Sequence, residues 1–287
     1  MEFELKTQYW DDPVALSAFK DFAYRIHGLD FNEFESRGFW DSAYTPFSLF
    51  DGETVVASMC IYSLDVVLDG TRTRLAQISG VGTLPQRRRQ GLNRRLTDIG
   101  LEWAAGWHDG VFLFSNPDAI PFYQQGGFKA IEEFVETTPA PRVKTCPGAG
   151  RLDPDRSKHL QKIYEFAQAR TPVSEKFGVL NAKLVMFHVL HDLRNCVIEL
   201  PDLNCLVMCG RAPGVLKIYD IIGCEIPRFV DLYPYLANKE DEVVEFHFFT
   251  DKLGLGNRST SVLKGNNPFV RPGFPVENPV FPYTSRA

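Results

Sequence analysis

One segment constrains the fold more than any other, because it joins an apolar strand to an amphipathic helix through an arginine-rich turn. It spans residues 81–97 and reads Val-Gly-Thr-Leu-Pro-Gln-Arg-Arg-Arg-Gln-Gly-Leu-Asn-Arg-Arg-Leu-Thr. Gly91 lets the backbone approach a ligand closely, and the first turn of the following helix leaves N–H groups free to bind an anion. The segment therefore predicts a strand–turn–helix unit that holds a pyrophosphate.

The charge of this turn contrasts with that of the whole chain. The formal net charge is -5 and the isoelectric point is about 5.7. Arginines at a helix start are electrostatically unfavourable, and a bound anion would relieve the repulsion, although a solvated charge run is the alternative. Nucleic-acid binders carry broad basic faces, so we expect no nucleic-acid partner. The arginines are Arg87, Arg88, Arg89, Arg94 and Arg95.

The first half of the chain alternates strand and helix patterns. Asp51-Gly52 and Asp69-Gly70 predict tight hairpins between three consecutive strands. The fold class that these patterns predict is α/β (α+β), with a mixed, mostly antiparallel sheet flanked by helices and a second, smaller domain of the same kind behind it. Helices are expected at 14–27, 31–37, 92–103 and 119–125, and strands at 3–9, 46–51, 54–68, 74–84, 111–114 and 128–136.

The second half partly repeats this order after a polar stretch, residues 138–154, that holds four prolines and two glycines. Residues 223–235 take the place of the arginine turn but lack its glycine and its basic cluster, so we expect no second site for the same ligand. The pattern predicts helices at 156–168, 182–191 and 228–236 and strands at 196–200, 203–209, 215–223 and 243–249.

These shifts in composition suggest four parts. We expect a catalytic domain at residues 1–140, a linker at 141–155, a degenerate second domain at 156–266 and a proline-rich tail at 267–287. Because Pro268, Pro272, Pro275, Pro279 and Pro282 recur so often, the tail is expected to be an extended surface segment or poorly ordered.

The six cysteines form no C-x-x-C pair and mostly lie in apolar runs, which is typical of small buried hydrophobic residues. Cys205 and Cys209 could share one strand face, but no histidine pair lies nearby, so we expect no metal. The N-terminus has no leader-like pattern and no apolar run approaches membrane-spanning length. A cytoplasmic protein without a membrane partner is expected.

The arginine turn resembles that of the GNAT superfamily, the acyl-CoA-dependent N-acyltransferases. Arg88 and Gly91 match the family pattern Arg/Gln-x-x-Gly-x-Gly/Ala, whereas Asn93 departs from its last position with a residue that tolerates positive φ comparatively well. The resemblance implies acetyl-CoA as co-substrate, no metal, and a pantetheine arm that pairs with the strand before the turn. The implied cofactor-binding residues are Val81, Gly82, Thr83, Arg88, Arg89, Gln90, Gly91, Leu92, Asn93, Arg94 and Asn116.

A second motif supports the same resemblance. Residues 116–128 match the family segment N-x-x-A-x-x-F/L-Y-x-x-x-G-F at every fixed position. In the family the asparagine contacts the cofactor and the tyrosine lies beside the thioester sulfur. Tyr123 is therefore our candidate general acid for the leaving thiolate, and the alternative is a half-buried aromatic residue that packs against the cofactor or core.

The general base is less clear from the sequence. Many family members use a glutamate on the strand that leads to the turn, but residues 75–83 carry no carboxylate. Asp65 on the neighbouring strand is the titratable candidate, with a solvent-facing residue as the alternative. Gln77 and Ser79 could orient a water, and catalysis would then rest mainly on proximity. A backbone N–H near Val81 or Gly82 is the expected oxyanion donor, although Gly82 could instead mark a bulge.

Aromatic residues crowd the N-terminal third and could line an acceptor pocket, although ordinary core packing is the alternative. They are Phe19, Phe22, Tyr24, Phe31, Phe34, Phe39, Trp40, Tyr44 and Phe47. The six histidines, His27 among them, show no triad or metal spacing, and we expect surface or packing roles for them. A small-molecule or protein amine is the expected acceptor, and a homo-oligomer is possible.

The chain as a whole resembles two-domain GNAT proteins with a degenerate second domain, such as the enhanced-intracellular-survival type. That type also has a sterol-carrier-like domain for which this chain is too short, and its C-terminal carboxylate serves as base; whether the tail around Ala287 reaches the site is open at this stage. We expect an acetyl-CoA-dependent N-acetyltransferase that works by direct attack in a ternary complex. The alternative is a non-catalytic acyl-CoA-binding or regulatory module.

Overall fold

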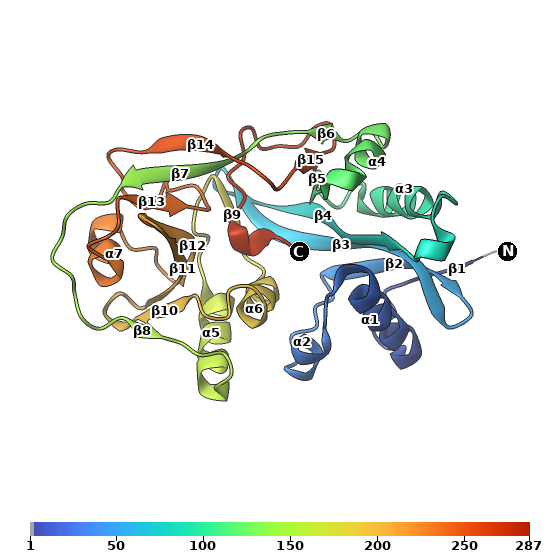
Figure 1. Ribbon diagram of the computed structural model, residues 1–287, viewed down its shortest axis with the longest axis horizontal. Helices are drawn as coiled ribbons and strands as arrows, with labels where there is room; N and C mark the ends of the chain where they lie inside the picture. The colour runs from blue at the N-terminus through green and yellow to red at the C-terminus, as the bar shows by residue number, and fades with distance from the viewer. Residues whose placement is uncertain (1–2) are drawn as a thin grey trace.

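The computed structural model describes residues 3–287, which form two β-sheets with helices on their faces (Figure 1). Local sequence signals set several element ends. Helix α1 (Pro13–His27) begins at Asp12, whose carboxylate accepts the N–H groups of Val14 and Ala15, and it ends at Gly28 with φ of 70°. No helix within residues 3–287 has the length and apolarity that a bilayer crossing requires.

The first sheet carries the arginine turn. Its strand order is β1-β2-β3-β4-β5-β15-β6, and β9 pairs with the far end of β3. The β4–β5 pair is parallel and the other pairs are antiparallel. The strands are β1 (Glu4–Thr7), β2 (Tyr44–Asp51), β3 (Thr54–Leu68), β4 (Thr71–Thr83), β5 (Gly110–Phe114), β6 (Lys129–Ala130), β9 (Phe177–Val179) and β15 (Pro268–Val270).

Helices cover both faces of this sheet. Figure 1 shows α1 and α2 (Asn32–Ser36) on one side, and α3 (Leu92–Ala104) and α4 (Ile120–Gln125) on the other. The apolar stripe of α3 packs on the sheet through Leu92, Leu96 and Ala104, all buried. The prediction of mixed, mostly antiparallel sheets flanked by helices is confirmed.

The second sheet repeats the plan of the first. Its order is β14-β7-β13-β12-β11-β10-β8, and the β12–β13 pair is parallel. The unit β12–α7–β13 therefore corresponds to β4–α3–β5, which supports the predicted internal duplication. The strands are β7 (Glu133–Pro139), β8 (Gly150–Arg151), β10 (Val197–Leu200), β11 (Cys205–Ala212), β12 (Val215–Gly223), β13 (Val243–Phe246) and β14 (Ser259–Leu263).

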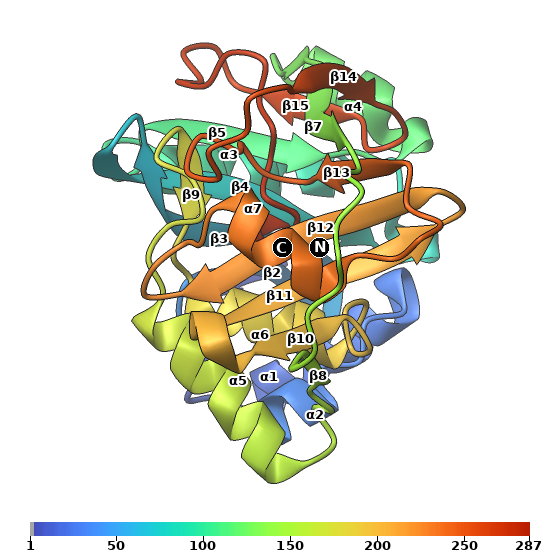
Figure 2. The ribbon, with the colours of Figure 1, turned by 90° about the vertical axis from the view of Figure 1, so that its left-hand side faces the viewer.

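Three helices sandwich the second sheet. Helix α7 (Phe229–Leu236) packs on the face that carries Val207 and Ile218, and it lies in front of the sheet in Figure 2. Helix α5 (Ser157–Ala169) packs on the opposite face, with Leu206 and Met208, and α6 (Ala182–Leu190) follows it. The face with α5 and α6 is turned toward the first half of the molecule (Figure 1).

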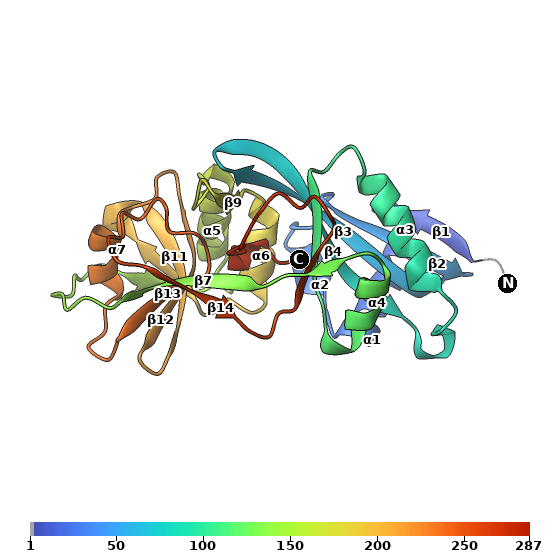
Figure 3. The ribbon, with the colours of Figure 1, turned by 90° about the horizontal axis from the view of Figure 1, so that it is seen from above.

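The two sheets exchange strands at corresponding positions. Strand β15, near the end of the sequence, pairs antiparallel with β5 and β6 in the first sheet. Strand β7, from the first half, pairs antiparallel with β13 and β14 in the second sheet, and Figure 3 shows it running from one half toward the other. The single strand expected at 128–136 is therefore two strands, β6 and β7, in different sheets.

Because of this exchange, the boundaries expected at residues 140 and 267 do not separate the strands of the two sheets. The residues 133–139 belong to the second sheet, and the tail contributes β15 to the first. Parts of the tail are also buried, since Phe269, Val270, Val280 and Phe281 lie in the core, whereas residues 271–278 are exposed or half-buried. Burial of these apolar side chains favours a packed tail despite its prolines. Pro268 stands at the first position of its strand, where a missing N–H costs least.

Candidate active site

The arginine turn forms the end of a cleft at the start of α3. Strand β4 ends at Thr83, a 3-10 turn covers Pro85–Arg87, and Gly91 precedes the helix with φ of 74°. Only glycine adopts this conformation without strain, and its missing side chain leaves the first N–H groups of α3 uncapped. The predicted strand–turn–helix unit is present, and it offers N–H donors to an anion.

Of the five arginines around the turn, only Arg87 has a carboxylate partner within residues 3–287. Arg87 pairs with Asp51, and Arg94 lies over the Phe122 ring at 5.2 Å. Arg88 makes only a 3.4 Å contact with the Thr83 carbonyl, and Arg89 is held at φ of 62°. The guanidinium groups without a carboxylate partner, beside a helix N-terminus, create a positive site that favours a phosphate.

The cleft has a volume of about 680 Å³ and runs from this turn along the end of β4. Asn93 takes ordinary helical backbone angles rather than a positive φ, and its buried Oδ1 has no hydrogen-bond partner within residues 3–287. All the residues expected to bind the cofactor line the cleft: Val81, Gly82, Thr83, Arg88, Arg89, Gln90, Gly91, Leu92, Asn93, Arg94 and Asn116.

A β-bulge interrupts the pairing of β4 with β3 at the inner end of the cleft. Ser58 pairs with Gly82 and Cys60 pairs with Ser79, so two residues of β4, Gly80 and Val81, oppose one residue of β3. Pairing of β4 with β5 stops at Ile78. The main chain beyond this point is therefore free of β5 and can pair with an extended ligand.

The bulge lies at Gly80 rather than at Gly82. Gly80 has φ of 58°, and a Cβ there would come 3.0 Å from the Tyr44 hydroxyl. Gly82 is required for a different reason, since a Cβ there would come 2.6 Å from Cγ2 of Ile26 on α1. Gly82 therefore lets α1 pack closely against β4.

Tyr123 lies behind the cleft, not among the residues that line it. The side chain is 5% exposed and packs against the rings of Phe122, Phe128 and Phe269. Burial raises the pKa of Tyr123 to about 12. The phenol therefore stays protonated at neutral pH, which a proton donor requires.

Asp65 lies away from the site. Its carboxylate is 59% exposed, pairs with Arg74 at 3.1 Å, and lines neither the cleft nor the cavity described next. Side chains alternate along a strand, and the position of Asp65 on β3 turns it toward solvent. The geometry matches the solvent-facing alternative and gives no support to Asp65 as the base.

A second cavity, mainly aromatic, lies on the other side of the bulge, with a volume of about 70 Å³. Four of the aromatic residues singled out in the sequence line it; the others do not. Tyr62, α6 and the last residue of the sequence complete the wall. The lining residues are Leu29, Phe31, Phe34, Trp40, Asp41, Tyr44, Tyr62, Ser79, Gly80, Leu184, Phe187 and Ala287.

The cleft and the cavity meet at the bulge. Ser79 and Gly80 line the cavity, whereas the next residues, from Val81 on, line the cleft. His27, at the end of α1, lines the cleft at this junction, although we expected only surface or packing roles for the histidines. Burial lowers the pKa of His27, and contact with the Gly80 backbone opposes this effect only in part. No spacing in the sequence marks this residue.

The end of the tail is held at the cavity by polar contacts from both halves. The Ala287 N–H donates to Oε1 of buried Gln77 at 3.0 Å, and the Arg286 carbonyl lies 2.9 Å from His188 Nε2. The Arg286 side chain pairs with Glu133 on β7. The tail therefore reaches the candidate site, a point that the sequence left open.

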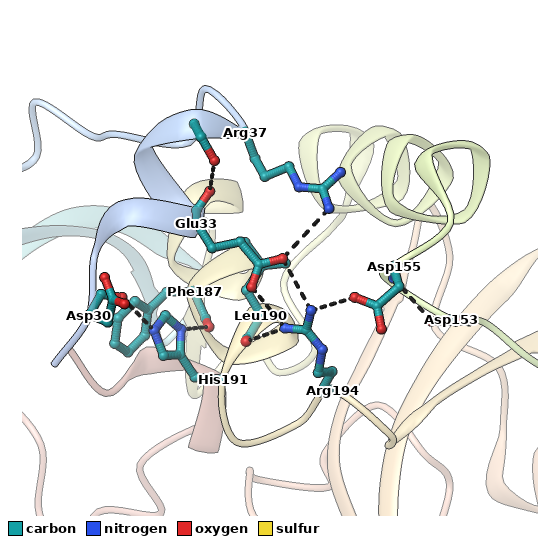
Figure 4. Close-up of polar contacts among 10 residues, drawn as sticks. Asp30, Glu33, Arg37, Asp153, Asp155, Phe187, Leu190, His191 and Arg194 are labelled. Atoms are coloured by element: carbon teal, nitrogen blue, oxygen red, sulfur yellow. Dashed lines mark hydrogen bonds and ion pairs between the residues drawn. The ribbon is translucent and has the colours of Figure 1, made fainter. Parts of the chain in front are cut away.

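Ionic contacts also fix the two helices that form the cavity wall. Arg194 binds both carboxylate oxygens of Glu33 at 3.1 Å and also pairs with Asp155 (Figure 4). His191 stacks on Phe187, with ring centroids 4.3 Å apart, and contacts the Asp30 carbonyl. These contacts join α2 to α6 and to the segment that follows α6. Phe34 lies on α2 and Phe187 lies on α6.

Comparisons with known proteins agree with this geometry. A family model described as an acetyltransferase (GNAT) domain matches residues 23–131, which include the arginine turn and the motif at 116–128. No curated protein matches the sequence.

Solved structures resemble nearly the whole chain. A probable N-acyltransferase of unknown function from Enterococcus faecalis V583 has 16% identity and a TM-score of 0.61, over 96% of this chain and 73% of that one. Eis1 from Mycobacterium abscessus has 17% identity and a TM-score of 0.54, over 94% and 73%. A GCN5-related N-acetyltransferase from Anabaena variabilis has 13% identity and a TM-score of 0.55, over 94% and 73%. Residues 23–131 therefore match a GNAT acetyltransferase domain, and the two halves of the chain together have an Eis-like, two-domain GNAT fold.

Proposed function

We propose that this protein transfers an acetyl group from acetyl-CoA to an amine by direct attack in a ternary complex. The proposal rests on one observation: the cleft and the aromatic cavity meet at the bulge in β4. The cleft has a positive end for a pyrophosphate, and the aromatic cavity opens beside the point where a thioester would end. The family match supports acyl-CoA-dependent N-acyl transfer.

The cleft suggests how acetyl-CoA would be held. The N–H groups at the start of α3, with Arg88 and Arg89, would bind the pyrophosphate. The free main chain at Val81 and Thr83 would hydrogen-bond the pantetheine arm as an added strand. Asn116 lines the same cleft and would contact the arm near the thioester.

The reaction would occur at the bulge. The amine nitrogen forms a bond to the thioester carbonyl carbon, and the C–S bond then breaks. A backbone N–H at Val81 or Gly82 would stabilise the oxyanion, and Tyr123 would give its proton to the leaving thiolate. The amine must lose a proton, and His27 is the titratable side chain beside the junction whose lowered pKa keeps it neutral and able to accept one.

Calorimetric titration with acetyl-CoA tests the cleft. We expect Arg88→Ala to weaken binding by about tenfold to a hundredfold, which corresponds to one charged hydrogen bond. Gly91→Asp should abolish binding, because it combines strain at positive φ with a negative charge. The matched controls are Arg72→Ala and Gly106→Asp. Arg72 is exposed at the other end of β4, and Gly106 has a φ of 80° but lies outside the cleft.

Release of free thiol in the presence of mixed amines tests the transfer. Amine-dependent release that disappears in Gly91→Asp supports the enzyme. The second candidate, a non-catalytic acyl-CoA-binding or regulatory module, is favoured by the absence of a carboxylate on β4 near the bulge. Tight binding of acetyl-CoA with no release from any amine would select that module, and no binding would contradict both.

A further inference from the structure

We propose that the acceptor is a monoamine carried on a compact apolar group, an arylalkylamine, and that a polyamine or other multiply charged amine is a poor substrate. This inference deepens the proposed transfer and rests on it. It starts from the aromatic cavity, since the acceptor must reach the bulge from the side that the cleft leaves free.

The walls of the cavity suit a flat apolar group. Phe31 lies between Trp40 and Phe187, with ring centroids 5.3 and 6.2 Å away, and Tyr44 faces Tyr62 at 6.1 Å. Such rings bind another ring by stacking or by edge contacts. The Trp40 Nε1–H is buried without a hydrogen-bond partner within residues 3–287.

The charges around the cavity fit one ammonium group but not several. Among the described residues that line it, Asp41 carries the charged side chain. The Asp41 carboxylate already accepts hydrogen bonds from the Tyr62 hydroxyl and the Ala43 N–H. Lys183 Nζ donates a hydrogen bond of 2.6 Å to the carbonyl of the preceding residue, Trp40. A second ammonium held beside the first would find no further acidic side chain among the described residues that line the cavity.

The size of the cavity sets a further limit. Its volume of about 70 Å³ is less than half of the roughly 150 Å³ of a cavity that holds benzene. It therefore accepts the slim end of an amine or the edge of a ring, with the rest of the molecule outside. The wall includes residues of both halves, Phe34 on α2 and Phe187 on α6, so the second half takes part in selecting the acceptor.

Matched pairs of amines test the proposal through kcat/KM for thiol release. We expect phenethylamine to exceed ethylamine by about tenfold or more, because the ring adds apolar area to be buried. Pentylamine should exceed 1,5-diaminopentane by a similar factor, since the two differ only in the second ammonium. A preference for the diamine over pentylamine, or no gain from the ring, would overturn the proposal.

Variants locate the effect in the cavity. Trp40→Leu should remove most of the phenethylamine advantage, whereas Trp107→Leu, at a side chain that is 73% exposed, should leave it unchanged. Asp41→Asn should raise KM for both monoamines without changing their order. Acetyl-CoA affinity serves as the folding control, because neither Trp40 nor Asp41 lines the cleft.

Direct binding separates failure of this inference from failure of the proposed transfer. Calorimetry of phenethylamine and 1,5-diaminopentane with the full chain needs no turnover. Tighter binding of phenethylamine that is lost in Trp40→Leu supports the acceptor class even if acetyl transfer is not detected. Transfer to the diamine with no binding of phenethylamine would keep the transferase and reject the acceptor class.

Discussion

At the scale of single residues, two glycines on β4 decide where the two cavities meet. Gly80 has the positive φ that the bulge requires, and Gly82 gives α1 room to pack. The bulge frees the main chain for a ligand, and the close packing brings His27 to the same point. Small changes at these residues should therefore affect binding as well as stability.

Gly82→Ala should separate α1 from β4. The added methyl would contact Ile26 at 2.6 Å and His27 at 3.1 Å, so the turn at the end of α1 must move. We expect a loss of about 1–3 kcal/mol in the free energy of unfolding, as for other overpacked positions, together with weaker acetyl-CoA binding. Denaturant titration and calorimetry measure both, and Gly256→Ala, at an open position, is the control. Unchanged affinity would mean that the end of α1 does not shape the cleft.

Tyr123→Phe tests the proposed proton donor while it preserves the ring packing. We expect kcat for thiol release to fall by about 10²- to 10⁴-fold, as for loss of general acid catalysis, with little change in acetyl-CoA affinity. Tyr24→Phe, at an exposed site, is the control. If kcat stays within twofold, Tyr123 has only the packing role that its buried ring also allows.

His27 should make the stability of the protein depend on pH. Its pKa in the folded protein lies below the ordinary value of 6.5, so the unfolded chain binds the proton more readily. Stability is therefore fully present above pH 6.5 and falls as the pH drops through the folded pKa. Denaturant titrations between pH 5 and 8 should show a smaller loss in His27→Gln.

His108 provides the comparison for this experiment. Burial lowers its pKa as well, so His108→Gln should also reduce the loss of stability at low pH. Only His27→Gln should alter the pH profile of amine transfer, because His108 lines neither cavity. Equal effects of both variants on that profile would remove His27 from the reaction.

At the scale of elements, the cavity wall depends on how α2 is held against α6. Helix α2 is a five-residue helix, too short to be stable alone, and its position relies on Glu33 and on packing of Phe34. Arg194 connects Glu33 to Asp155 across the two halves (Figure 4). The position of this part of the cavity wall therefore depends on contacts between the two halves.

Arg194→Ala should loosen the acceptor side alone. The ion pairs are partly exposed, so we expect a loss of only about 1 kcal/mol in stability. KM for the amine should rise severalfold, while acetyl-CoA affinity stays unchanged because α3 and β4 are untouched. Arg228→Ala, which breaks an exposed pair on α7, is the control. An equal change in both affinities would contradict this separation.

The sequence predicts elements whose signals are local. The turn at Gly91, the hairpins at Gly52 and Gly70 and the start of α1 follow from conformations that a few neighbouring residues determine. The partners of a strand are less predictable, because an alternating apolar pattern does not identify the sheet. The sequence therefore places the strand predicted at 128–136 in the first domain, although residues 133–139 pair in the second sheet.

The residues named for cofactor binding come from two local motifs, at 81–97 and 116–128, and all of them line the cleft. The acceptor side combines Phe31 with Phe187 and Ala287, which are far apart in the sequence. Periodicity does not reveal such contacts, and frequent prolines in the tail mask its buried Phe269 and Phe281. The sequence does not reveal the place of His27 in the cleft, because that place depends on burial against β4.

At the scale of the whole molecule, the two halves share their cores. One apolar cluster contains Phe22 and Ile61 from the first half together with Met186 and Leu206 from the second. Another joins Leu75 to Phe281. The buried pair of Arg170 and Asp220 also holds Thr284 of the tail. The halves are therefore one packing unit despite their separate sheets.

The full chain should consequently unfold in one transition. Phe269 lies in β15, is 1% exposed and packs against Tyr123, so Phe269→Ala should cost about 3–5 kcal/mol. Calorimetry should show the entire transition shifted to lower temperature, since both sheets depend on the exchanged strands. Two transitions, with only one shifted, would show that the halves unfold independently.

The exchange of strands also determines when this protein can first become active during its synthesis. Strand β5 is completed early, but β15 lies about 150 residues further along the chain, so their pairing closes a long loop and forms slowly. The first sheet therefore waits, with an unpaired edge at β5, until almost the entire described chain has left the ribosome. During that interval the unpaired edge of β5 is open to association with other chains.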